Sequence, residues 1–153
     1  MSASPAAVFD QIDEPGRLSA HMSRKSWQLG DTSMSIEPDA AGGRAVGSHI
    51  RLRGQMLGLA LEVECVVVKR IPNELKEWET VGTPRLLVIG SYRMGVRIVP
   101  HNGGSRVTVA IDYAMPSRAW ERVIANALGP IYARWCVRQM ASDLVRRFHS
   151  KGS

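Results

Sequence analysis

Only a few side chains in this sequence are candidates for chemistry, and their spacing matches no known catalytic motif. Tyr92 and Tyr113 could donate a proton, and Arg93 could hold a carboxylate or phenolate if it lay inside a cavity. Strand alternation, however, predicts that Arg93 lies on the face opposite Tyr92 and favours a surface position. His21 and His49 are the histidines best placed to act as acids or bases. A nucleophile, its base and an orienting group must lie within hydrogen-bond reach of one another. No spacing here proposes such a set, so the catalytic residues remain unknown.

The two cysteines, Cys65 and Cys136, fall in a strand-like segment and a helix-like segment. They do not form a metal-type pair, and the chain lacks the clustered ligands that a metal requires. In a cytosolic chain both thiols would stay reduced. We therefore expect two small, buried apolar residues, and neither a metal nor another cofactor.

Length and composition predict a single domain over residues 1–153. A chain of 153 residues with 44% apolar residues can bury a genuine core. The longest apolar run, Leu86–Ile89, is far shorter than a membrane span. The start, Met1 to Pro5, has neither the basic nor the apolar part of a secretory signal. We therefore expect a soluble cytoplasmic protein without a membrane span.

The chain carries 20 basic residues against 14 acidic ones, which gives a formal charge of +6 at pH 7. A basic balance indicates nucleic-acid binding only where the charges cluster. Here they are spread along the chain, and the nearest approach to a run is Arg146-Arg147. The charge therefore favours solubility, and nucleic acid is not the expected partner.

Strand-like segments with alternating apolar residues fill most of the region from Gly47 to Tyr113. They are 46–52, 59–68, 75–81, 86–99 and 106–113, with a weaker pattern at 27–36. His101–Gly104 is a strong hairpin turn, and Gly82–Pro84 predicts another turn. Gly90 and Gly95, inside a strand pattern, predict bulges or bends.

The first two of these segments would form a hairpin with one charged face. If the chain turns around Met56-Leu57, Arg51 faces Glu62 and His49 faces Glu64. Opposite-charge pairs across strands contribute about 0.2–1 kcal/mol each, so this face is expected to be solvated and paired. The residues predicted to point inward are Ser48, Ile50, Leu52, Val63, Cys65 and Val67.

Helical patterns stand at both ends of the chain. Ser4-Pro5 predicts the start of a short helix that Glu14–Gly16 ends, and a second short turn follows at 17–22. A long helix is predicted over 117–149, with a kink at Gly129-Pro130. Its apolar side up to the kink and just beyond comprises Trp120, Ile124, Ala127, Leu128, Ile131 and Trp135.

Four segments taken in order resemble the START-like, or SRPBCC, superfamily, which includes polyketide cyclases/dehydratases and lipid-transfer proteins. They are Pro5–Ile12, Val46-Gly47, Val68–Trp78 and Gly103–Val107. Each motif alone is weak, whereas the ordered set is fairly specific for fold and poorly specific for function. The resemblance implies an α+β helix-grip fold. In it a curved antiparallel sheet of about six to seven strands wraps around a long C-terminal helix, with two short helices near the N-terminus.

The resemblance also implies a cavity between the sheet and the C-terminal helix. With an apolar, aromatic interior, such a cavity would bind a small hydrophobic or amphipathic ligand of the lipid, polyketide or isoprenoid type. The side chains expected to contact it are Ile50, Leu52, Met56, Val63, Cys65, Trp78, Tyr92, Tyr113, Ile131 and Trp135.

Two alternatives remain open. A polyketide cyclase/dehydratase-type enzyme would need an ionisable group inside the cavity, supplied by one of the two tyrosines, Arg93 or His49. A module that binds protein or RNA through the outer sheet face would need a basic patch. His49, Arg51 and Arg53 could form one only without acidic neighbours.

The sequence departs from the superfamily at its start. Members normally have a strand before the first helix, and that strand lies inside the sheet, between the second and the last. Here only Met1–Ser4 precede Pro5. We expect either that the true start lies upstream or that the sheet is left gapped and is completed by a second chain, as a homodimer.

Overall fold

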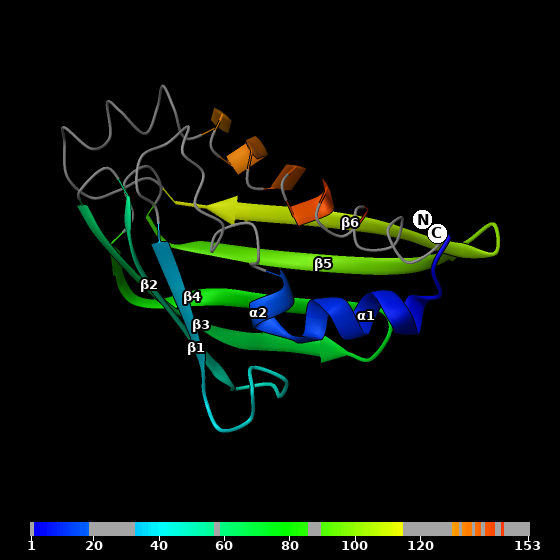
Figure 1. The fold of residues 1–153 in the computed structure, drawn as a ribbon, viewed down its shortest axis with the longest axis horizontal. Coiled ribbons are helices and arrows are strands. Elements are labelled where there is room, and N and C mark those ends of the chain that lie inside the picture. The colour runs from blue at the N-terminus through cyan, green and yellow to red at the C-terminus, as the bar shows by residue number, and fades with distance from the viewer. Residues whose placement is uncertain are drawn as a thin grey trace.

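In the computed structural model, the described part of the chain begins with two short N-terminal helices followed by six strands (Figure 1). The structure describes residues 2–18, 33–56, 59–85 and 90–114, together with the helical residues 130–131, 133–135, 137–138, 140–142 and 145. The α+β class and the two short helices near the N-terminus are confirmed.

Helix α1, Pro5–Asp13, begins as the sequence predicts. The side chain of Ser4 accepts a hydrogen bond from the Ala7 backbone N–H at 3.3 Å, and Pro5 occupies the first turn. The apolar side of the helix, Val8, Phe9 and Ile12, is buried. Helix α2, Pro15–Leu18, starts two residues earlier than the predicted turn at 17–22.

The six strands form one curved antiparallel sheet in which each strand pairs with the next along the chain. The strands are β1 (Ser33–Pro38), β2 (His49–Met56), β3 (Leu59–Ile71), β4 (Leu75–Arg85), β5 (Tyr92–His101) and β6 (Gly104–Tyr113). Strands β1 and β6 therefore stand at the two ends of this order.

The β2–β3 hairpin has the predicted faces but not the predicted register. Met56 pairs with Leu59, so Arg51 faces Glu64 and Arg53 faces Glu62. The predicted register was wrong by two residues. Because side chains alternate with a period of two, this shift leaves each residue on its predicted face. All six residues predicted to point inward are buried.

The predicted turn at Gly82–Pro84 is wrong, because β4 continues through these residues to Arg85. Gly82 has a φ of +70°, and the pairing of β3 with β4 shifts between Glu62 and Glu64. An irregular pairing of this kind absorbs a proline, which cannot donate to the ladder. The turn signal therefore marks a bulge inside a strand.

The β5–β6 hairpin closes as predicted, through Asn102 and Gly103 with φ of 46° and 74°. A bulge or a bend is predicted at Gly95, and the bulge is absent, since Gly95 pairs in register with both Glu77 and Ala110. A Cβ at Gly95 would lie 3.2 Å from Cγ of Glu77. The glycine therefore makes room for a neighbouring side chain.

One hydrophobic cluster joins α1 to one face of the sheet, which we call the inner face. Val8, Phe9 and Ile12 supply the helix side of this cluster. The sheet side consists of Ile50, Leu52, Val63, Cys65, Val67, Trp78, Met94, Val96 and Ile98. Met140, a helical residue of the C-terminal part, belongs to the same cluster and so packs on the inner face as well.

The C-terminal helix is described only in part. Ala133 and Met140 are buried, whereas Ile131 and Trp135 are 65% and 38% exposed. Since successive helical residues are about 100° apart, Ile131 points nearly opposite to Ala133. Most of the predicted range 117–149, including residues 117–129, lies outside the described residues, so the length and kink of this helix stay predictions.

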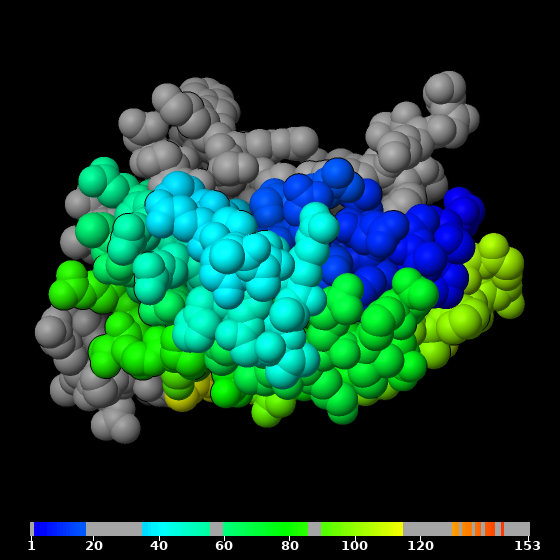
Figure 2. Space-filling view, turned by 90° about the horizontal axis from the view of Figure 1, so that it is seen from below, coloured from blue at the N-terminus to red at the C-terminus, as the bar shows by residue number. Residues whose placement is uncertain are grey.

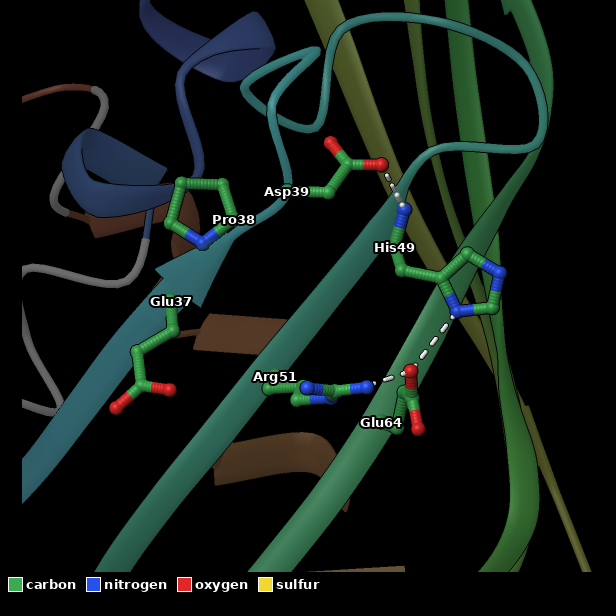
Figure 3. Close-up of a pocket in the computed structure, with 6 residues that line it drawn as sticks. All are labelled: Glu37, Pro38, Asp39, His49, Arg51 and Glu64. Atoms are coloured by element: carbon green, nitrogen blue, oxygen red, sulfur yellow. Dashed lines mark hydrogen bonds and ion pairs between the residues drawn. The ribbon is translucent and has the colours of Figure 1, made fainter.

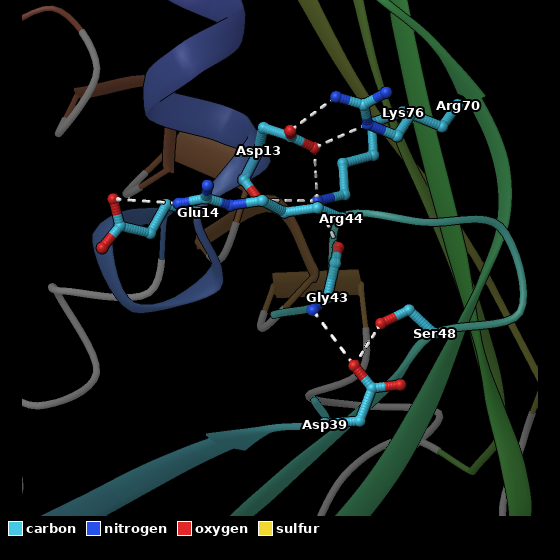
Figure 4. A network of polar contacts seen from close by, with 8 residues as sticks. All are labelled: Asp13, Glu14, Asp39, Gly43, Arg44, Ser48, Arg70 and Lys76. Atoms are coloured by element: carbon cyan, nitrogen blue, oxygen red, sulfur yellow. Dashed lines mark hydrogen bonds and ion pairs between the residues drawn. The ribbon is translucent and has the colours of Figure 1, made fainter. Parts of the chain in front are cut away.

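A buried polar network, which the sequence reasoning did not predict, ties α1 to the sheet and to the loop between β1 and β2 (Figure 4). Lys76 Nζ donates to Asp13 Oδ1 at 3.0 Å, to the Asp13 carbonyl at 2.9 Å and to the Gly43 carbonyl at 2.8 Å. Arg70 forms a bidentate ion pair with the Asp13 carboxylate, with hydrogen bonds of 3.0 and 2.7 Å. Figure 2 shows the loop against the N-terminal helices.

The charged groups in this network stabilise one another in their ionised forms. Burial by itself raises the pKa of Asp13, but hydrogen bonds from Arg70 and Lys76, with their charges, bring it below its usual value. Burial lowers the pKa of Lys76, and the bond to Asp13 opposes this. The Lys76 side chain is 2% exposed. The ammonium is therefore supported by three acceptors in place of water.

Asp39 fixes the same loop from its other side (Figure 4). Its carboxylate accepts hydrogen bonds from the Ser48 hydroxyl and from the backbone N–H groups of Ala41, Gly43 and His49. The Ser48 bond, with the backbone bonds, lowers the pKa of Asp39 to about 2. The loop thus returns the chain from β1 to β2 in one defined path.

Candidate functional site

The inner face of the sheet brings together the predicted ligand-contact residues of β2, β3 and β4. Ile50, Leu52, Val63, Cys65 and Trp78 are all buried on this face and belong to the core cluster. They form one continuous apolar wall because alternate residues of adjacent strands point the same way. This part of the predicted set is brought together as expected; ligand contact by these residues stays a prediction.

Tyr92 places a polar group on the same wall. Its ring is half-buried against the core cluster, and its hydroxyl lies 3.3 Å from Sγ of Cys65. The backbone N–H of Tyr92 donates to the Thr80 hydroxyl at 3.0 Å. Tyr113 pairs directly with Tyr92 across β5 and β6. The two tyrosines therefore stand side by side at one end of the wall.

The Cys65 thiol is a hydrogen-bonding group and not a nucleophile. Burial raises its pKa to about 11, although the Tyr92 hydroxyl acts in the opposite direction. A thiol with such a pKa is protonated at neutral pH, and only the thiolate is strongly nucleophilic. Cys65 is fully buried, as the sequence predicts.

The structure does not place the remaining predicted contact residues, Met56, Ile131 and Trp135, in this wall. The side chain of Met56 lies outside the described part of the chain. Ile131 is 65% exposed and Trp135 38% exposed, and neither belongs to the core cluster that forms the wall. Ligand contact by these three side chains stays a prediction.

Arg93 and His49, the other ionisable candidates, lie on the outer face. Arg93 pairs with Glu77 at 3.1 Å, on the side of β5 opposite Tyr92, as the alternation predicts. His49 Nδ1 lies 2.9 Å from Glu64 Oε1. Of the four ionisable groups considered for an enzyme, the two tyrosines alone remain on the inner side.

A groove of about 460 Å³ lies on the outer face of β1, β2 and β3 (Figure 3). Glu37, Pro38, Asp39, His49, Arg51 and Glu64 line it. Glu64 accepts hydrogen bonds from both His49 and Arg51, the latter at 3.3 Å. The groove is thus lined by exposed charged groups that pair with one another, whereas small-molecule sites are mostly apolar.

The basic side chains beside this groove all have acidic neighbours. Arg53 pairs with Glu62 at 3.0 Å and lies 3.7 Å from Glu37. The hydrogen bond from His49 and the charge of Arg51 hold the pKa of Glu64 below its usual value, against the effect of burial. The unpaired basic patch that an interaction module would require is therefore not formed by these residues.

Metal-binding and membrane-spanning features are absent from the described residues. No three His, Cys, Asp or Glu side chains among them lie close enough together to hold a metal ion. Within the same ranges, no helix has the length and apolar character needed to cross a bilayer.

Several solved structures share this fold at low sequence identity. Protein CV1439 from Chromobacterium violaceum has a TM-score of 0.64 and 16% identity, over 94% of this chain and 88% of that one. Ara h 8.0201 has a TM-score of 0.56 and 11% identity, over 95% and 92%. A norcoclaurine synthase from Thalictrum flavum has a TM-score of 0.52 and 15% identity, over 92% and 89%.

No protein-family model matches the sequence, and neither does any curated protein. At these identities the structural likeness shows the fold alone: an antiparallel curved sheet with few helices, consistent with the helix-grip type. The fold expectation is thereby supported in its coarse form.

Proposed function

We propose that this chain belongs to the START-like superfamily and binds a small hydrophobic or amphipathic ligand. The ligand would be of the lipid, polyketide or isoprenoid type and would lie between the inner face of the sheet and the C-terminal helix. The observation that carries the proposal is the half-buried Tyr92, whose hydroxyl meets Cys65 on an otherwise apolar wall.

This arrangement has the composition of a site for an amphipathic molecule. Such sites combine apolar walls with a few polar groups that set the orientation of the ligand. Leu52, Val63 and Trp78 supply apolar side chains that are buried on the inner face. The Tyr92 hydroxyl can both donate and accept a hydrogen bond. It would orient the polar end of a ligand whose apolar part packs along the strands.

The structural neighbours support the proposal at the level of fold. The norcoclaurine synthase was solved as a complex with a transition-state analogue, so the same fold holds a small molecule in that protein. Function does not follow from fold. The proposal therefore rests mainly on the apolar wall and the Tyr92 hydroxyl.

Native mass spectrometry of gently purified protein tests this proposal. We expect a co-purifying small molecule whose occupancy falls in Tyr92→Ala, because the substitution removes both the ring and the hydroxyl from the wall. Val99→Ala on the outward side of β5, where the side chain is 43% exposed, is the matched control and should keep the occupancy. If no small molecule co-purifies and the apoprotein does not bind a dansyl-labelled fatty acid, the proposal is contradicted.

A cyclase or dehydratase activity is the second candidate, and the placement of Tyr92 beside Tyr113 favours it. In a dehydration a tyrosine would give its proton to a hydroxyl group of the substrate, which would leave as water. The resulting tyrosinate would take the proton from the neighbouring carbon, so that a C=C bond replaces the broken C–O bond and the tyrosine is regenerated. Incubating the protein with its co-purified compound and following the compound's mass tests this candidate. Loss of water with wild type but not with Tyr92→Phe would support an enzyme, and an unchanged mass would support a carrier.

A further inference from the structure

Strand β6 forms a long edge of the sheet with which no described residue pairs on its outer side. It has 10 residues and no proline, whereas β1 at the opposite end has 6 residues and ends in Pro38. Short strands and prolines protect sheet edges, and a long unprotected edge is a template for another strand. Strand β6 is therefore the edge suited to pairing.

The direction of the free backbone groups follows from Ala114. Its N–H donates to the Ser91 carbonyl at 2.7 Å, and its carbonyl accepts from the Gly90 N–H at 2.9 Å, so both point toward β5. Backbone groups alternate sides along a strand, and the β5–β6 register has no shift. The groups of Val107, Val109 and Ile111 therefore point away from β5, toward the open edge.

We propose that this edge pairs with β6 of a second copy of the chain, antiparallel and with Val109 on the two-fold axis. In that register Val109 opposes itself and Val107 opposes Ile111. These pairs exchange the outward-pointing backbone groups, as an antiparallel ladder requires. The two six-stranded sheets become one continuous sheet.

Charge complementarity selects this register. With the axis at Val109, Arg106 of each copy faces Asp112 of the other, which gives two opposite-charge pairs per dimer. Moving the axis by one residue in either direction places Arg106 opposite Ala110 or Ala114 instead. Asp112 has no ion pair with any described residue, and Arg106 contacts His101 at 3.1 Å. The Asp112 carboxylate is thus available on the outer face.

The inner faces are complementary as well. Val107, Val109 and Ile111 pack against the core cluster and are only half-buried, and among the described strands β6 has a neighbour on one side alone. In the dimer they meet the same three residues of the second copy. An isologous interface of this kind closes after two subunits. The inference concerns β6 alone and does not depend on the proposed ligand.

Sedimentation equilibrium of the chain and its charge variants tests the inference. We expect wild type to dimerise at concentrations up to about 100 µM. Arg106→Glu alone and Asp112→Arg alone place like charges opposite each other at both pairs, and each should weaken dimerisation about tenfold or more. The double variant R106E/D112R restores opposite charges and should dimerise as wild type does.

Arg97→Glu is the control, since it makes the same charge change on β5, away from the edge. It should leave the dimer intact. A monomeric wild type over the same range would overturn the inference. So would a dimer that survives both single variants, because another surface would then form it. Circular dichroism confirms that each variant is folded.

Discussion

At the scale of single residues, Asp39 shows how one exposed carboxylate can hold a loop. Its folded pKa of about 2 lies below the ordinary 3.8, because the Ser48 hydroxyl and three backbone N–H groups donate to the ionised form. A lowered pKa means that the stabilisation is complete above the unfolded value and is lost as pH falls through the folded value.

We therefore predict that Asp39→Asn removes part of the acid dependence of stability between about pH 4 and pH 2. Urea unfolding measured across this range is the test. Asp10→Asn, on the exposed side of α1, is the control and should retain the wild-type slope. Equal slopes for wild type and Asp39→Asn would contradict the assignment.

Among the polar side chains, we expect the removal of Lys76 to lower the free energy of unfolding the most. Lys76→Ala leaves the Asp13 and Gly43 carbonyls without their donor and opens a cavity under α1. Breaking a buried ion pair typically costs about 3–5 kcal/mol, and we expect a loss of this size in the free energy of unfolding. Lys69→Ala, exposed on β3, should change it by less than about 0.5 kcal/mol.

At the scale of elements, the turn between β5 and β6 depends on one glycine. Gly103 has a φ of +74°, and a Cβ added there meets no atom within 4 Å. Gly103→Ala should therefore destabilise the protein through backbone strain alone, by about 1–2 kcal/mol. Gly16→Ala in α2 also meets no atom but lacks the positive φ, so it should be neutral or slightly stabilising. Equal effects in chemical unfolding would refute this account.

The sequence predicts which face each strand residue occupies but not which residue it opposes. The alternation from Ile50 to Leu52 and from Val63 to Val67 is sufficient to predict the face of each residue. A two-residue shift preserves that alternation, so the register of Arg51 against Glu64 could not be obtained from it. Likewise, the bulge at Gly82 has the same composition as a turn, and only the pairing with β3 distinguishes them.

In the candidate site too, the sequence predicts the face of each residue but not its contacts with other strands. The apolar wall and the opposite placement of Arg93 and Tyr92 follow from alternation. The contact between Tyr92 and Cys65 joins strands that are not neighbours, and no local pattern encodes it. The burial of Lys76 could have been predicted from the sequence. Lys76 lies two residues before the buried Trp78, so both side chains are on the inner face, where a lysine must find hydrogen-bond partners.

At the scale of the whole molecule, the sheet, α1 and Met140 share one core on the inner face. The proposed ligand would lie on this side, and the proposed second copy would join at the β6 edge. The two proposals use different surfaces, so ligand binding can be tested in the monomeric charge variants.

The central claim is that the inner face contacts the ligand, and intermolecular nuclear Overhauser effects test it most directly. The measurement uses methyl-labelled protein and an unlabelled fatty acid. We predict cross-peaks from the fatty acid to the methyl groups of Ile50, Leu52 and Val63 on the inner face. Cross-peaks confined to outward methyl groups such as those of Val99, or none under saturating fatty acid, would contradict the claim.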